Sequence, residues 1–124
     1  MATIGVGVDV VDVVRFSELL ERRDGLADRL FTAQEREDAS EAPERLAARF
    51  CAKEATLKAL GVGLGHAWHD IVVHRLPSGA PTLVLSGEVL ELATARGVRN
   101  WHLSLSHSDS TAIAYVVATD EEGQ

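Results

Sequence analysis

The chain has 124 residues, of which 46% are hydrophobic and 25% charged, and its formal net charge is -7 at pH 7. These values are typical of a globular protein that folds as one domain over residues 1–124, and the acidic balance argues against general nucleic-acid binding. The N-terminus lacks a signal-peptide pattern, and no stretch approaches the roughly 20 apolar residues of a membrane span, so we expect a cytoplasmic protein without a membrane partner. The single cysteine, Cys51, excludes a disulfide within the chain.

The first third of the sequence predicts one strand and two helices. Residues 4–8 are β-branched and spaced by glycine, which predicts a strand that ends before Asp9. A helix with one apolar face follows over residues 12–22, and Asp12 is placed to cap its N-terminus. Thr32 and Glu35 have the spacing of a capping box, which predicts the start of a short polar helix.

A longer helix is predicted over residues 43–60, and it is apolar nearly all round, which is typical of a buried helix. Glu54 and Lys58 lie four residues apart on it and therefore share a face, and Arg49 and Lys53 form a second polar pair at the same spacing. Charges on a buried helix cost stability unless they are paired or bind a ligand. This conflict points to a functional site on the helix.

The last half of the sequence predicts a mostly antiparallel sheet. Gly61 is placed to end the long helix in a left-handed conformation, and residues 121–124 are expected to be a frayed tail. The pattern between them predicts a hairpin, a helix and two further strands, over residues 70–75, 82–85, 88–96, 101–106 and 112–118. This order of elements predicts an α+β fold in which helices pack on the sheet.

Two carboxylates carry the first functional hypothesis. Asp9 either faces a site or caps the next helix, and Asp12 is the better cap. Glu54 either forms an ordinary helix ion pair with Lys58 or is functional. Two carboxylates from distant segments are a common way to hold Mg²⁺, which takes one or two protein carboxylates together with waters and substrate phosphates. The positive residues of the same helix could then bind phosphate oxygens, with solvated surface charges as the alternative.

Other motifs are weaker. His107 follows two serines, but there is no G-x-S-x-G elbow, so we reject a serine hydrolase. Cys51 is expected to pack in the core and not to act as a nucleophile. The glycine-rich residues 61–65 follow a helix, so no helix N-terminus points into them as in a phosphate cradle. Four histidines lack metal-ligand spacing: His66, His69, His74 and His102.

The order and spacing of four segments resemble those of one known family, the holo-acyl-carrier-protein synthases, which are the short group of 4'-phosphopantetheinyl transferases. The resemblance runs from Ile4 to Ala118, with two mild departures: Cys51 stands where alanine is common, and Asp12 stands where glutamate is common. The segments that carry it are Gly5-Val6-Gly7-Val8-Asp9-Val10-Val11-Asp12, Phe31-Thr32-x-x-Glu35, Arg49-Phe50-Cys51-Ala52-Lys53-Glu54-Ala55-x-x-Lys58-Ala59-x-Gly61-x-Gly63 and Leu103-Ser104-Leu105-Ser106-His107-Ser108.

The resemblance implies an Mg²⁺-dependent transfer of 4'-phosphopantetheine from coenzyme A to a serine of apo-acyl carrier protein, with release of adenosine 3',5'-bisphosphate. It also implies the family's α+β fold, a homotrimer with shared active sites, and a role in fatty acid biosynthesis and lipid metabolism. By motif position, Asp9 and Glu54 would hold the metal, Lys58 would contact the pyrophosphate, and Glu54 could take the serine proton. The coenzyme A pocket would be lined by Arg49, Lys53, His107, Gly79 and Pro81.

Partner surfaces can be proposed as well. Carrier proteins are typically acidic, so a local positive face is needed on this acidic chain. Four arginines in and near the first helix could provide it: Arg15, Arg22, Arg23 and Arg29. The apolar strand over residues 112–118 could be central in one chain, or it could leave a face for a partner subunit in a homotrimer.

Two alternatives belong to other functional classes. The first is a noncatalytic module that binds coenzyme A or a nucleotide on the same fold, although the intact Asp9, Glu54 and Lys58 argue against a decayed site. The second is a structural α+β interaction domain, which leaves the charges of the long helix unexplained.

Overall fold

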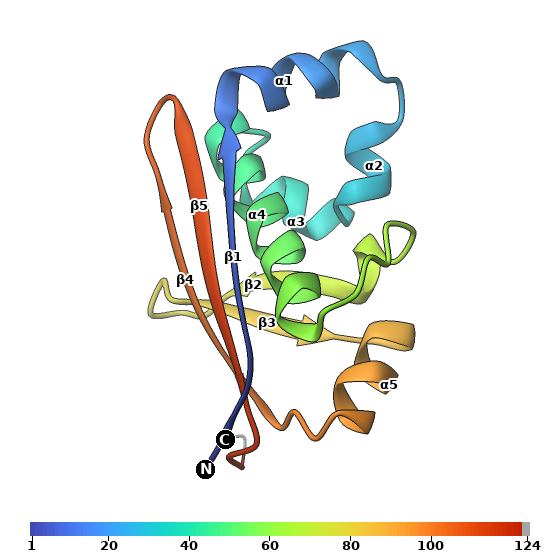
Figure 1. The fold of residues 1–124 in the computed structure, drawn as a ribbon. Helices are drawn as coiled ribbons and strands as arrows, with labels where there is room; N and C mark the ends of the chain where they lie inside the picture. The colour runs from blue at the N-terminus through green and yellow to red at the C-terminus, as the bar shows by residue number, and fades with distance from the viewer. Residues whose placement is uncertain (123–124) are drawn as a thin grey trace.

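The computed structural model describes residues 1–122, so residues 123–124 of the predicted tail lie outside the described part. Residues 1–122 form five strands, five α-helices and a short 3₁₀ turn, in the predicted order except for one short helix and the turn, which were not predicted (Figure 1). In chain order these are β1 (Thr3–Asp12), α1 (Val13–Arg22), α2 (Leu26–Leu30), α3 (Ala33–Asp38), α4 (Pro43–Leu60), η1 (Trp68–Asp70), β2 (Ile71–Arg75), β3 (Pro81–Leu85), α5 (Gly87–Ala95), β4 (Asn100–His107) and β5 (Thr111–Thr119).

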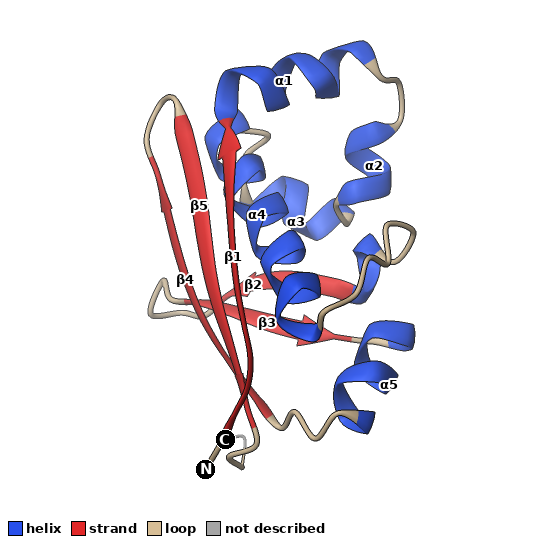
Figure 2. Ribbon diagram, viewed as in Figure 1, coloured by secondary structure: helices blue, strands red, loops and turns tan. Residues whose placement is uncertain are grey.

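Two antiparallel sheets support the helices. The larger sheet has the order β1-β5-β4, and β2 and β3 form a separate hairpin that crosses behind it (Figure 1). The helices all lie on one side of the larger sheet, while its other side carries none (Figure 2). The predicted α+β class with antiparallel pairing is therefore confirmed. No helix within the described 122 residues combines the length and apolar character needed to span a bilayer.

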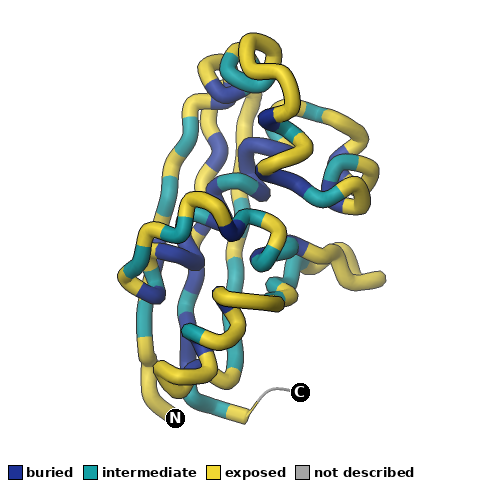
Figure 3. Tube along the Cα trace, turned by 90° about the vertical axis from the view of Figure 1, so that its right-hand side faces the viewer, coloured by how far each residue is buried: buried dark blue, intermediate teal, exposed yellow. Residues whose placement is uncertain are grey.

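Helix α4 lies at the centre of the fold, and most of its residues are buried, in contrast to the exposed loops (Figure 3). It packs closely on β1 because two glycines of the strand have no side chain. A Cβ atom on Gly5 would lie 2.0 Å from the carbonyl oxygen of Ala59, and one on Gly7 would lie 1.9 Å from that of Ala55. Any larger residue would push the helix away from the strand.

The predicted caps at the starts of α1 and α3 and at the end of α4 are confirmed. The Asp12 side chain accepts a hydrogen bond from the backbone N–H of Arg15 at 3.0 Å and so caps α1. Thr32 and Glu35 form the predicted capping box of α3. Gly61 ends α4 with φ 71° and ψ 30°, in the left-handed region where glycine is favoured.

Three expectations were wrong in detail. Strand β1 continues to Asp12, which pairs with Thr111, so Asp9 lies inside the strand and not after it. Helix α2 was not predicted, because its five residues are too few to show a helical period. Glu35 belongs to a short helix that looked polar, yet its side chain is fully buried.

Candidate functional site

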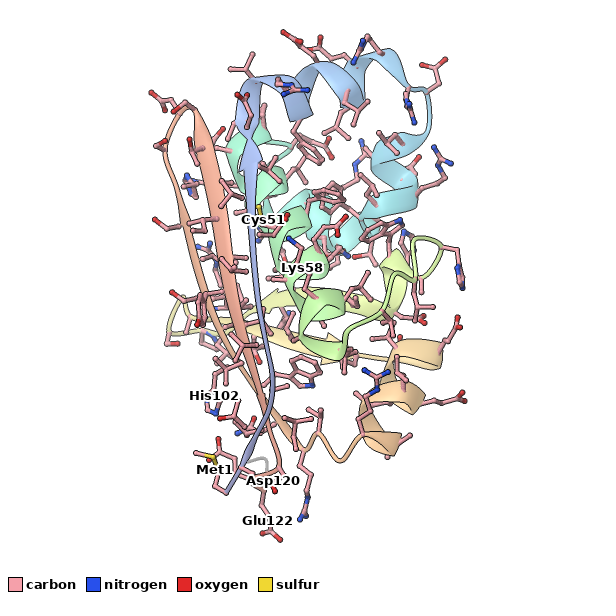
Figure 4. All side chains as sticks on the ribbon, viewed as in Figure 1. Met1, Cys51, Lys58, His102, Asp120 and Glu122 are labelled. Carbon is pink, nitrogen blue, oxygen red and sulfur yellow. The ribbon has the colours of Figure 1, made fainter. Side chains whose placement is uncertain are left out.

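Asp9 and Lys58 meet where α4 crosses β1. Asp9 pairs in the sheet with the buried Ala114, on the face that α4 covers. The Lys58 ammonium lies 3.0 Å from Oδ1 of Asp9 and donates a second hydrogen bond, of 3.1 Å, to the carbonyl oxygen of Val8. Lys58 thus pairs across the fold with Asp9, which differs from the ordinary helix pair with Glu54 that spacing alone suggested. Figure 4 labels Lys58 on α4 beside β1.

Glu54 belongs to the same cluster. Burial raises the pKa of its carboxyl, the negative charge of Asp9 raises that pKa further, and Lys58 opposes both effects. One lysine therefore faces two carboxylates. With all three groups ionised the cluster has a net negative charge, which a bound cation would neutralise. Two neighbouring carboxylates are also the kind of oxygen donors that Mg²⁺ prefers, because this ion takes its other ligands from water and substrate. Within residues 1–122, His, Cys, Asp and Glu form no group of three or more that could hold a metal.

Cys51 lies beside this cluster but is not part of its chemistry. The thiol is fully buried and donates a weak hydrogen bond of 3.4 Å to the carbonyl oxygen of Ala112. Burial raises the pKa of the thiol to about 12, and the charge of Asp9 acts in the same direction. Cys51 therefore stays protonated and packs in the core, as we expected from the sequence.

A second site lies beside β4, the edge strand of the larger sheet opposite β1. Four predicted pocket residues line one cavity of about 180 Å³, and the cavity has two further arginines that the sequence analysis did not single out. The predicted four are Arg49, Gly79, Pro81 and His107, and the additional arginines are Arg45 and Arg75. Arg45 could have been found from its position one helical turn before Arg49. Arg75 could not, because only the tertiary fold brings the end of β2 to α4.

The charge of this cavity favours an anionic ligand. Arg49 is only 3% exposed, and within the described residues its Nε atom has no hydrogen-bond partner. Burial lowers the pKa of Arg49, and the positive charge of Arg75 lowers it further. Buried guanidinium groups with unused donors are stabilised by an anion, and they bind phosphate well because of their planar geometry.

Lys53 is not found in that cavity. Its side chain is fully buried, and its ammonium donates to Glu35, Trp68 and Ile71 inside the protein. Arg49 and Lys53 do share a face of α4, as predicted, but the part of this face that carries Lys53 turns toward the core. We therefore leave Lys53 out of the proposed ligand site.

The four arginines proposed for partner binding lie on or near α1 and α2, and none of them lines this cavity. All four are exposed. Arg15 and Arg22 line a groove along α1, while Arg23 and Arg29 line a neighbouring cavity of about 500 Å³. The wall of that second cavity also includes apolar side chains: Phe16, Leu19, Leu26, Leu30, Phe50 and Trp68.

Sequence relatives agree with this geometry. The profile of the 4'-phosphopantetheinyl transferase superfamily matches residues 5–116. A holo-[acyl-carrier-protein] synthase from Frankia casuarinae is 53% identical over 118 residues, which cover 95% of this chain and 98% of that protein. A holo-[acyl-carrier-protein] synthase from Beutenbergia cavernae is 52% identical over 115 residues, with 93% and 97% coverage.

Solved structures give the same result. The holo-[acyl-carrier-protein] synthase of Helicobacter pylori, in complex with coenzyme A, aligns with a TM-score of 0.82 at 29% identity, covering 92% of this chain and 99% of that one. The synthase–coenzyme A complex from Chronobacterium ammoniagenes aligns with a TM-score of 0.83 at 32% identity, covering 95% and 97%. Sequence profile, relatives and fold agree over most of the chain, which therefore belongs to the 4'-phosphopantetheinyl transferase superfamily.

Proposed function

We infer that this chain transfers the 4'-phosphopantetheine group from coenzyme A to a serine of apo-acyl carrier protein and releases adenosine 3',5'-bisphosphate. We place this step in fatty acid biosynthesis in the cytoplasm. The observation that carries the inference is the meeting of Asp9, Glu54 and Lys58 across β1 and α4 in a member of this family. A noncatalytic binding module would not need two carboxylates and a lysine at one point.

The reaction moves negative charge onto the pyrophosphate. The serine hydroxyl of the carrier protein attacks the phosphate that bears the pantetheine arm, and the bond to the bisphosphate breaks. Lys58 is placed to stabilise charge on the phosphate oxygens, and Glu54, directly or through a water, to accept the serine proton. Asp9 and Glu54 would hold Mg²⁺, which would supply positive charge to neutralise the pyrophosphate.

The arginine-lined cavity is proposed to bind the bisphosphate end of coenzyme A. Its support is the unused Nε of Arg49 and the mutual repulsion of Arg49 and Arg75, which an anion would relieve. His107, exposed at the end of β4, completes the wall. A His107→Ala variant should fold normally and bind adenosine 3',5'-bisphosphate more weakly in calorimetry, whereas unchanged binding would place the nucleotide elsewhere.

We propose that the acyl carrier protein docks on the arginines of α1 and α2. An acidic partner would be attracted to these four arginines, although Asp12 and Glu18 line the same groove as Arg15 and Arg22 and the chain has a net charge of -7. The adjoining apolar cavity would form the apolar core of the interface, and the exposed arginines would form its polar rim.

A homotrimer is proposed from the free side of the larger sheet. That side carries exposed apolar side chains in neighbouring rows: Val6 48%, Val8 43%, Val10 59%, Ile113 37% and Tyr115 49%. A contiguous apolar patch on a monomer is a mark of subunit contact. These exposed side chains support the prediction, made from the sequence, that one face of the sheet is left for a partner subunit. The sharing of active sites between subunits is implied by the family resemblance.

Mass spectrometry tests the function directly. The protein is incubated with an apo-acyl carrier protein, coenzyme A and Mg²⁺, and the carrier should gain the mass of one phosphopantetheine group. A carrier with its reactive serine replaced by alanine is the matched control. Binding of coenzyme A without any mass gain would instead support the noncatalytic module.

A further inference from the structure

A buried ion pair lies behind the arginine-lined cavity. Glu35 and Lys53 are both fully buried, and the Lys53 ammonium lies 2.8 Å from Oε1 of Glu35. The same ammonium donates to the carbonyl oxygens of Trp68, at 2.9 Å, and Ile71, at 2.5 Å. Its three protons therefore each have an acceptor inside the protein, which leaves no donor for a ligand.

The carboxylate of Glu35 is equally well satisfied. Its Oε1 also accepts the backbone N–H of Thr32 at 3.0 Å, and its Oε2 accepts the backbone N–H of Val73 at 3.0 Å. The pair thus joins the start of α3, the middle of α4, the turn η1 and strand β2. Three of the four backbone partners, Trp68, Ile71 and Val73, belong to η1 and β2.

These segments carry the two walls of the arginine-lined cavity. Helix α4 supplies Arg49, one turn before Lys53, while β2 ends at Arg75, two residues after Val73. The hairpin that follows Arg75 and the end of β4 supply the rest of the lining. Hydrogen bonds of the Glu35–Lys53 pair to Ile71 and Val73 therefore connect the two elements that carry Arg49 and Arg75.

Stability alone does not explain this pair. Exchanging a buried ion pair for apolar side chains of similar volume is often neutral or stabilising, because the desolvation of two charges is avoided. An ion pair with directed backbone acceptors, by contrast, is satisfied in only one register of helix against strand. An apolar contact has no directed hydrogen bonds, so it selects one register of helix against strand less strictly.

We propose that Glu35 and Lys53 are positioning residues that hold β2 against α4 and thereby set the spacing of Arg49 and Arg75 for the phosphates of coenzyme A. Neither residue touches the ligand. The proposal rests on the assignment of the cavity to the bisphosphate end of coenzyme A, made above.

The test compares three variants with the parent: Glu35→Gln, Lys53→Met and the double variant, which leaves no unpaired buried charge. Val89→Ala, on α5 and not among the hydrogen-bond partners of Glu35 or Lys53, is a matched control for loss of stability. Thermal unfolding, kcat and the KM values for coenzyme A and carrier protein are measured, together with the calorimetric Kd of adenosine 3',5'-bisphosphate. All assays are done at a temperature where the variant concerned is folded by circular dichroism.

We expect the double variant to fold and to raise both the KM for coenzyme A and the Kd of the bisphosphate about tenfold, as is typical when residues that orient binding groups are lost. The KM for the carrier protein should stay unchanged. Val89→Ala should lower the unfolding temperature and change neither nucleotide constant.

Several results would overturn the proposal. Parent-like nucleotide constants in the double variant would make the pair purely structural, and so would an equal rise in Val89→Ala or in the KM for the carrier protein. Failure of all three variants to fold would assign the pair to folding instead. The His107→Ala variant separates this outcome from a wrong cavity assignment, because it reports on the cavity without touching the pair.

Discussion

At the level of single residues, the candidate active site depends on one lysine that serves two carboxylates. Lys58 bonds to Asp9, whereas Glu54 carries a pKa raised by burial and by the charge of Asp9. This arrangement favours a bound cation and keeps the oxygen of Glu54 available as a proton acceptor.

Glu54→Gln tests that assignment, because it keeps the shape of the side chain and removes its charge. We expect the rate of carrier modification to fall roughly 10²-fold or more, as for the loss of an acid–base or metal-binding group. Glu44→Gln, in the first turn of the same helix, should keep the parent rate. A Glu54→Gln rate within a few-fold of the parent would rule out both roles of Glu54.

Cys51 gives a prediction about pH. Its pKa is raised from 9.0 to about 12 in the folded protein, so above pH 9 the unfolded chain releases a proton that the folded chain keeps. Stability should therefore fall as the pH rises, by up to about 1.4 kcal/mol per pH unit from this group. Cys51→Ala should lack this component when the unfolding free energies of parent and variant are compared from neutral pH to pH 10. A constant difference would show that the thiol ionises normally.

At the level of elements, the close packing of α4 on β1 brings the proposed catalytic groups together. The glycines of the Gly5-x-Gly7-x-Asp9 segment need no unusual backbone angles, and their role is to let the helix backbone approach the strand. The motif therefore combines a packing requirement with the proposed metal-binding carboxylate of Asp9, two residues later. The motif can be seen in the sequence. Only the structure shows that its glycines are needed because the backbone of α4 lies directly against them.

Gly7→Ala tests this packing. The new Cβ would lie 1.9 Å from the carbonyl oxygen of Ala55, so α4 has to move, at a cost of about 3 kcal/mol of stability for such overpacking. Activity should fall as well, because the helix carries Glu54 and Lys58 away from Asp9. Gly63→Ala is the control, since no atom lies within 4 Å of its added Cβ. Equal stability of the two variants in urea unfolding would contradict the packing argument.

At the level of the whole molecule, two surfaces are candidates for partner binding. Four exposed arginines lie on or near α1 and α2, beside acidic residues such as Glu18, and the free side of the larger sheet carries exposed apolar side chains on a chain that is acidic as a whole. We propose a different partner for each surface: an acidic carrier protein on the first and further copies of this chain on the second.

Charge reversal tests the carrier surface. Arg15→Glu or Arg22→Glu should raise the KM for the carrier protein and leave that for coenzyme A nearly unchanged. The effect should shrink at high salt, because exposed charges are screened beyond about 10 Å near 0.1 M. Arg99→Glu, outside this arginine cluster and paired with the exposed Glu122, is the control. A parallel rise in both KM values would assign these arginines to the nucleotide or the fold.

Light scattering tests the trimer. The parent should have about three times the chain mass of 13.3 kDa. Tyr115→Lys places a charge in the middle of the apolar sheet face and should give a monomer with little activity, whereas Val84→Lys, on the separate hairpin, should remain trimeric. A monomeric parent with full transferase activity would contradict both the trimer and the shared site.

The order of the main elements, three helix ends, the hairpin and the candidate catalytic residues could all be predicted from the sequence. These features depend on local preferences or on motifs that one stretch of chain displays. The burial of Glu35, the internal pairing of Lys53 and the arrival of Arg75 at the cavity could not be predicted, because each depends on segments far apart in sequence. A charged residue on a helix looks the same in sequence whether it meets solvent, a ligand or a buried partner, and only the tertiary packing around α4 decides which.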